Sequence, residues 1–136
     1  MRFFVVVAVS AAMLAASSAA RANAGAEQAF GLWRVADGSA IIRIKPCGTA
    51  LCGFVAAAPA PASGEKSAVG QKILLDLRRE GDHWRGPIFN LDDQKTYDGE
   101  ISMGVDGARL KVKGCVPGGG VCGGETWKRE PEAPPR

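Results

Sequence analysis

Residues 31–45, GLWRVADGSAIIRIK, determine how the fold begins. Asp37 and Gly38 supply the two positions that tolerate positive φ angles, as a type I′ hairpin turn requires. Beyond the turn, Ile42 and Ile44 fall on one face of an extended chain, and the charged residues beside them fall on the other. The segment therefore predicts a β-hairpin with one buried face and one solvated face.

The same two-residue period continues along the chain, and no stretch has the pattern of a long amphipathic helix. Eight strand candidates are separated by turn residues: 30–36, 39–46, 52–58, 71–79, 83–89, 95–103, 108–115 and 121–129. Consecutive strands with one apolar face can close on themselves and leave no exposed edge. The sequence therefore predicts an all-β fold, an eight-stranded antiparallel up-and-down barrel, with a two-sheet sandwich as the alternative.

The alternation assigns a set of side chains to the barrel interior. They are Trp33, Val35, Ala40, Ile42, Ile44, Ile73, Leu75, Leu77, Trp84, Ile88, Tyr97, Ile101, Met103, Leu110 and Val112. In the fourth candidate strand this assignment leaves Leu74 on the outer face. Pro87 has no N–H to donate to a ladder, so we expect a bulge or a local gap there.

The N-terminus has the features of a secretory signal peptide. Arg2 precedes an apolar run over residues 3–16, and residues 22–24, ANA, have the form of a cleavage site. The run is shorter than the roughly 20 residues of a membrane-spanning helix. We expect residues 1–24 to be a signal for export to the periplasm or beyond, residues 25–129 to form one barrel domain, and residues 130–136 to be a disordered tail.

The charge pattern does not indicate a nucleic-acid partner. The formal net charge is +3, but Arg2 and Arg21 fall in the predicted signal, which leaves 15 basic against 14 acidic residues. The basic residues of the predicted domain are interleaved with acidic ones, so no basic stripe is formed.

All four cysteines lie in the predicted domain, and an oxidising compartment favours two disulfides. Local pairing joins Cys47 to Cys52 and Cys115 to Cys122 across turns, and is worth about 2 kcal/mol per bond. A crossed pairing would close a longer loop and stabilise by roughly 4 kcal/mol. We favour the local pairs because hairpin strands hold such cysteines close together.

Catalytic constellations are weak in this sequence. The single histidine, His83, stands beside no nucleophile, and Asp92 and Asp93 fall in a turn where such residues satisfy backbone donors. The cysteine spacings do not favour zinc. We therefore expect a protein that is not an enzyme and has no catalytic residue, metal or cofactor.

Several stretches spread over the predicted domain resemble one family. They are residues 30–34 (FGLWR), 46–48 (PCG), 51–53 (LCG), 95–97 (KTY), 110–115 (LKVKGC) and 125–129 (ETWKR). In these stretches the chain resembles the small secreted bacterial proteins of domain of unknown function 2147 (DUF2147), a family without an assigned activity. The resemblance implies a lipocalin-like barrel. This chain differs from the family in residues 59–70, which are shorter, and in residues 86–89, GPIF.

The lipocalin resemblance also implies a role for Trp33. In such barrels a basic residue of the last strand covers a tryptophan of the first strand, and Arg129 or Lys128 matches that position. A cation over an indole contributes about 0.5–2 kcal/mol. We expect Trp33 and Arg129 to plug one end of the barrel.

An eight-stranded barrel is close to the size at which side chains either fill the interior or leave room for one small ligand. We expect an exported barrel that binds a small hydrophobic molecule, with Trp84, Phe89, Tyr97 and Met103 as candidate ligand-binding residues. Ordinary core packing is the alternative for these side chains. The alternative function is a protein-binding barrel, such as a periplasmic hydrolase inhibitor, acting through loops or residues 25–29.

Overall fold

The computed structural model describes residues 28–132. The predicted signal peptide, residues 1–24, and the last four residues of the predicted tail, 133–136, lie outside the described residues. The predicted tail begins with Glu130, which is the last residue of the final strand. Glu132 forms an ion pair with Arg43 on the second strand, with a distance of 2.9 Å between the charged atoms.

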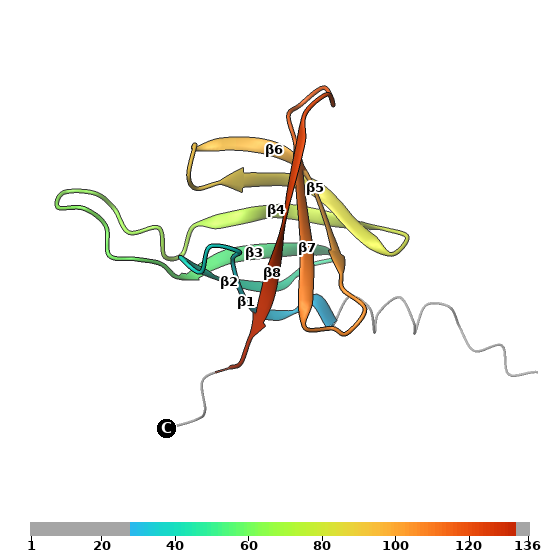
Figure 1. The fold of residues 1–136 in the computed structure, drawn as a ribbon, viewed down its shortest axis with the longest axis horizontal. Helices are drawn as coiled ribbons and strands as arrows, with labels where there is room; N and C mark the ends of the chain where they lie inside the picture. Colours follow the sequence, from blue (N-terminus) through green and yellow to red (C-terminus); the bar gives the residue numbers. More distant parts are fainter. Residues whose placement is uncertain (1–27, 133–136) are drawn as a thin grey trace, which may run out of the picture.

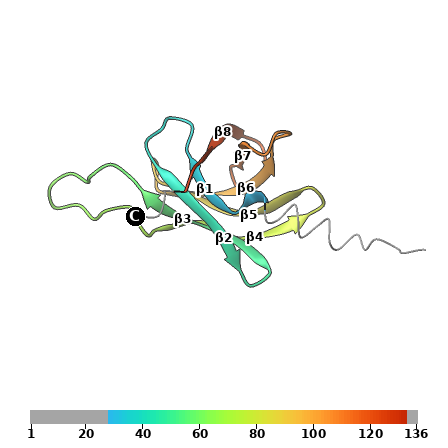
Figure 2. The same ribbon diagram turned by 90° about the horizontal axis from the view of Figure 1, so that it is seen from below.

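Eight antiparallel strands form a closed barrel in sequence order, which confirms the predicted architecture (Figure 1 and Figure 2). The strands are β1 Gly31–Arg34, β2 Ile41–Cys47, β3 Ala50–Ala57, β4 Lys72–Glu80, β5 His83–Asn90, β6 Lys95–Met103, β7 Arg109–Cys115 and β8 Cys122–Glu130. The barrel closes where β1 pairs with β8, for example Trp33 with Arg129. Closure on the shortest strand, β1, leaves the described sheet without an exposed edge.

The alternating strand direction gives the barrel two different ends. The turns β1–β2, β3–β4, β5–β6 and β7–β8 lie at one end, which we call the mouth. The remaining turns lie at the other end, which we call the closed end, together with the start of β1 and the finish of β8. The longest connection, residues 58–71, and the projecting β7–β8 hairpin both belong to the mouth (Figure 1).

The interior is a single apolar cluster of buried side chains from all eight strands. Most of the predicted inward residues belong to it, but β4 differs from the prediction. Leu74 is 0% exposed, whereas Leu75 is only partly buried and lies outside the cluster. The register of β4 shifts against both neighbours, and Asp76 has a φ of 57°. Extra residues in the strand therefore interrupt the strict alternation and return Leu77 to the interior.

The irregularity expected at Pro87 lies in the partner strand instead. The pairing of β5 with β6 runs without interruption through Pro87, which is opposite Asp98. On the other side of β5, the pairing with β4 is broken between Leu74 and Arg78. The irregularity next to β5 is therefore in β4, whose pairing is broken beside the stretch that contains Pro87.

Inward-facing glycines make room for large side chains of the adjacent strand. Each glycine and the side chain that fills its place are Gly53 with Leu74, Gly86 with Leu77, and Gly99 with Ile88. A Cβ atom on Gly99 would lie only 2.2 Å from Cγ1 of Ile88. Small and large residues thus alternate at these three positions, and the large side chain of one strand fills the space above the glycine of its neighbour.

Candidate functional site

The barrel interior is not filled at the mouth. A cavity of about 380 Å³ opens there, at the lower end of the range of small-molecule pockets. It is lined by strand side chains and by two of the mouth turns: Val35, Asp37, Ser39, Ala40, Ile42, Ile73, Ile88, Phe89, Asn90, Leu91, Asp92, Tyr97, Val112, Gly114, Gly123, Gly124, Glu125 and Trp127.

The cavity exists because no side chain of a neighbouring strand fills the space above Gly123 at one wall. Gly114 and Gly123 pair across β7 and β8 and both line the cavity. A Cβ atom on Gly123 would meet no heavy atom within 4 Å, in contrast to one on Gly99. The floor below is apolar and includes Ile42 and Val112. A ligand in this cavity would therefore contact bare backbone on one side and apolar side chains beneath.

Trp127 and Glu125 lie on the same face of β8, two residues apart, and both line the cavity. The Trp127 side chain is nearly buried, and its indole N–H donates to Glu125 Oε1 at 2.5 Å. This bond satisfies the polar atom of a buried ring and fixes one oxygen of the carboxylate above it. The sequence analysis did not identify either residue. Because side chains two apart in a strand share a face, an inward Trp127 implies an inward Glu125.

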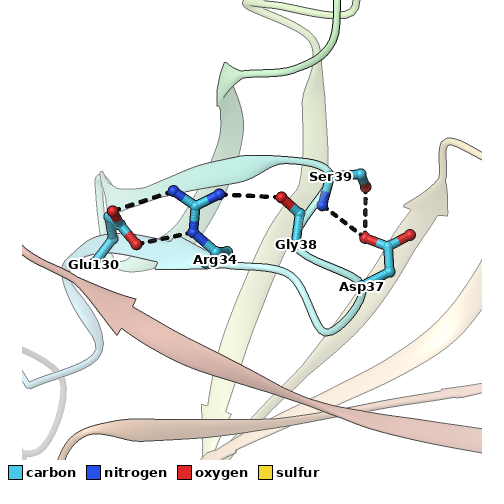
Figure 3. A network of polar contacts seen from close by, with 5 residues as sticks. All are labelled: Arg34, Asp37, Gly38, Ser39 and Glu130. Carbon is cyan, nitrogen blue, oxygen red and sulfur yellow. Dashed lines mark hydrogen bonds and ion pairs between the residues drawn. The ribbon is translucent and has the colours of Figure 1, made fainter.

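The β1–β2 turn forms one part of the cavity rim and is held by a polar network on its outer side (Figure 3). Arg34 donates to both carboxylate oxygens of Glu130, at 3.1 and 3.2 Å, and to the Gly38 carbonyl at 3.0 Å. Asp37 accepts bonds from the Ser39 hydroxyl and backbone N–H, at 2.6 and 2.9 Å, and these bonds lower the pKa of Asp37. The turn is thus tied to the last strand.

The β5–β6 turn forms the facing part of the rim. The Tyr97 hydroxyl donates to Asp93, which raises the pKa of Tyr97 and, with the Lys95 backbone N–H, lowers the pKa of Asp93. The Asp92 backbone N–H donates to Asn90 Oδ1 at 2.9 Å. The turn role predicted for the two acidic residues is therefore present for Asp93, which accepts from the Lys95 backbone N–H, whereas Asn90 is the accepting side chain at Asp92. Asp92 and Tyr97 also line the cavity.

The four predicted ligand-binding residues are divided between the two barrel ends. Phe89 and Tyr97 line the cavity, but Trp84 and Met103 do not. Trp84 stands near the start of β5 and Met103 ends β6, so both lie at the closed end. The Arg79 guanidinium carbon covers the Trp84 ring at 4.5 Å from its centroid. Antiparallel strand direction thus separates Trp84 from Tyr97, and the expectation that they share one mouth is corrected.

Trp33 and Arg129 lie together at the closed end. The Arg129 guanidinium carbon is 4.2 Å from the centroid of the fully buried Trp33 ring. Arg129 also donates to three backbone carbonyls, those of Gln28, Phe30 and Gly107. The Trp33 indole donates to the Ala29 carbonyl at 2.8 Å. These bonds hold residues 28–30 across the base of the barrel.

Both local disulfides are present. Cys47–Cys52 joins β2 to β3 at the closed end, and Cys115–Cys122 joins β7 to β8 at the mouth. Cys47, Cys52 and Asp76 are the one group of potential metal ligands among residues 28–132. The sulfur atoms of Cys47 and Cys52 are bonded to each other, so this group offers no thiolate. The two disulfides fit an oxidising extracellular environment.

The closed barrel and the cavity at one end define a lipocalin-like protein. The chain belongs to the family described as "Uncharacterized protein conserved in bacteria (DUF2147)", whose model matches residues 31–129. This confirms the family resemblance. The fold is similar to that of protein HP1028 from the human pathogen Helicobacter pylori, which is described as belonging to the lipocalin family.

The similarity to HP1028 has a TM-score of 0.61 at 18% sequence identity, over 75% of this chain and 82% of that one. At this identity the comparison establishes the fold alone. The comparison with curated proteins gives no match. Among residues 28–132, none of the helices has the length and apolar character needed to span a membrane.

Proposed function

We propose that the protein is an exported, non-enzymatic barrel that binds a small molecule with an apolar body in the cavity at its mouth. The observation that carries the proposal is the cavity of about 380 Å³, with its apolar floor and Trp127, in a lipocalin-like barrel that is otherwise closely packed. The predicted signal peptide and the two disulfides support export. The protein's single histidine, His83, pairs with Asp82 at the β4–β5 turn and does not line the cavity.

The test is to fill the cavity with a side chain. Gly123→Leu places a large apolar group in the open space above the β8 backbone, where no neighbour stands within 4 Å. Gly120→Leu makes the same change at the hairpin tip, which also has no neighbour within 4 Å and does not line the cavity. Binding of the neutral fluorescent probe N-phenyl-1-naphthylamine is measured by titration for both variants and for the unchanged protein.

We expect the probe to bind the unchanged protein and Gly120→Leu equally. Gly123→Leu should weaken binding about tenfold or more, because the added side chain occupies the ligand volume. Equal probe affinity in all three proteins would place the probe outside the cavity and contradict the proposal. Native mass spectrometry of protein purified from its host provides an independent measurement, with a bound small-molecule adduct as the expected result.

The alternative of a protein-binding barrel has less structural support. Its predicted arm, residues 25–29, lies partly outside the described residues, and Gln28 and Ala29 are held against the closed end by Arg129 and Trp33. The exposed valines Val116 and Val121 at the β7–β8 hairpin tip are the feature that favours it. Absence of probe binding by the unchanged protein would favour this alternative.

A further inference from the structure

The charges around the cavity are of one sign. Three carboxylates line it, those of Asp37, Asp92 and Glu125, and the lining contains no lysine, arginine or histidine. None of the three forms an ion pair with a basic side chain of residues 28–132. Elsewhere on the described surface, Arg34, Arg43 and Lys72 each pair with a carboxylate. Unpaired carboxylates also occur elsewhere among the described residues, as at Asp98 and Asp106, but at the cavity three of them line one hollow that has no basic lining residue.

The three carboxylates come from different walls of the barrel. Asp37 belongs to the β1–β2 turn, Asp92 to the β5–β6 turn, and Glu125 to β8. Asp37 already accepts two hydrogen bonds from Ser39, and these bonds hold the turn. Glu125 has one oxygen bonded to the Trp127 indole, and within residues 28–132 no donor reaches its second oxygen, Oε2. Glu125 is thus the carboxylate that is both fixed in place and free to accept a bond from a ligand.

Aromatic rings stand beside these carboxylates. Phe89, Tyr97 and Trp127 all line the cavity, together with the aliphatic floor. Aromatic faces attract cations. The three carboxylates are on exposed residues at the mouth, so a cation can reach them from solution while the apolar floor lies beneath them. The field of these carboxylates repels an anionic head group. Two basic side chains act on the rim from outside the cavity lining: Arg34 donates to the Gly38 carbonyl, and Lys95 acts on Asp93.

We propose that the ligand is a small organic cation, an amine with an apolar body, whose ammonium group binds Glu125 at the mouth while its body contacts Trp127 and the floor. This inference rests on the proposed function, because it specifies the class of molecule that the same cavity takes. It does not rest on the acidic residues alone. They are part of a cavity with apolar and aromatic walls, and the indole bond holds Glu125 above that floor.

The test compares three probes with one apolar body and different head groups: 4-phenylbutylamine, 4-phenylbutanol and 4-phenylbutanoate. Affinities are measured by isothermal titration calorimetry at pH 7 and low salt. The variant is Glu125→Gln, which removes the charge and keeps an oxygen that can accept the Trp127 bond. The matched control is Asp98→Asn, which removes one charge from an exposed position on β6 that does not line the cavity.

We expect the amine to bind about tenfold more tightly than the alcohol, since a hydrogen bond to a charged group contributes that much. The anionic probe, 4-phenylbutanoate, should bind most weakly. Glu125→Gln should reduce amine affinity about tenfold and leave alcohol affinity unchanged, while Asp98→Asn should alter neither. Unchanged alcohol binding also shows that the variant cavity is intact.

The other outcomes separate the two proposals. If the alcohol binds as tightly as the amine, or the carboxylate binds best, the cation inference is wrong and the proposed function stands. An amine preference that survives Glu125→Gln overturns the assignment to Glu125. If none of the three probes binds, the proposed function fails and the inference fails with it.

Discussion

Gly99→Ala tests the packing of the barrel interior with a single methyl group. A Cβ atom at this position would lie 2.2 Å from Ile88 Cγ1, 2.3 Å from Ile88 Cδ1 and 2.9 Å from the Gly86 carbonyl oxygen. Carbon atoms make favourable contacts at about 3.5–4.0 Å, so the overlap exceeds about 1 Å. The Ile88 side chain must therefore move. Because the third atom belongs to the backbone, movement of Ile88 alone does not remove every close contact, and overpacking of this kind costs about 1–3 kcal/mol.

The matched control is Gly123→Ala, the same change on a strand glycine whose new Cβ meets nothing within 4 Å. Both variants gain the roughly 0.5–1 kcal/mol by which alanine exceeds glycine in a strand, so the difference between them isolates the steric cost. The free energy of unfolding is measured by urea titration, followed by tryptophan fluorescence. We expect Gly99→Ala to be about 1–3 kcal/mol less stable than Gly123→Ala, which corresponds to a melting temperature lower by roughly 4–8 °C per kcal/mol. Equal stability would show that Ile88 does not fill the place above Gly99.

Three further predictions concern the ends of the barrel. Replacing Cys115 and Cys122, which are 7 residues apart, with serine should lower the free energy of unfolding by about 2 kcal/mol in a urea titration. With a reducing agent present, both disulfides of the unchanged protein and the Cys47–Cys52 disulfide of the variant are open, so the two proteins should be equally stable. Arg129→Met should cost about 1–2 kcal/mol in the same measurement, because it removes the cation over Trp33 and the bonds to backbone carbonyls, whereas Lys128→Met should be nearly neutral. Hydrogen bonds lower the pKa of three carboxyl groups: Ser39 acts on Asp37, Tyr97 on Asp93 and Arg34 on Glu130. These bonds stabilise the fold fully above the ordinary carboxyl pKa of about 4, and the stabilisation is lost as the pH falls through the lower pKa values of the folded state. Denaturation midpoints should therefore be level from pH 7 to 5 and fall below about pH 4, and Asp37→Asn should reduce that fall.

The number and order of the strands could be predicted from the sequence because turn residues and a period of two recur along the chain. The range of β6 was predicted without error, and the other strand limits lie within two residues of those expected. The assignment in β4 was wrong for Leu74 and Leu75 because alternation holds only while the register is regular. Asp76 has a positive φ, and no residue type in KILLDL signals that extra residues interrupt the strand there.

The candidate site could be predicted only in part. Phe89 and Tyr97 were placed at the cavity by their apolar character, and the same criterion selected Trp84 and Met103, which lie at the closed end. Strand direction would have separated the two pairs, because neighbouring antiparallel strands bring the start of one beside the finish of the other. Glu125 was missed because it follows two glycines, where no apolar alternation defines which face is inward.

The two ends of the described chain leave the barrel on the side opposite the cavity. Leu32 of the first strand pairs with Glu130 of the last, and residues 28–30 lie beneath Trp33 at the base. A tether fused beyond Glu132 would therefore anchor the molecule by its base. Protein immobilised in this way on a sensor surface would present its opening to the solution, with no attachment chemistry near Glu125 or Trp127.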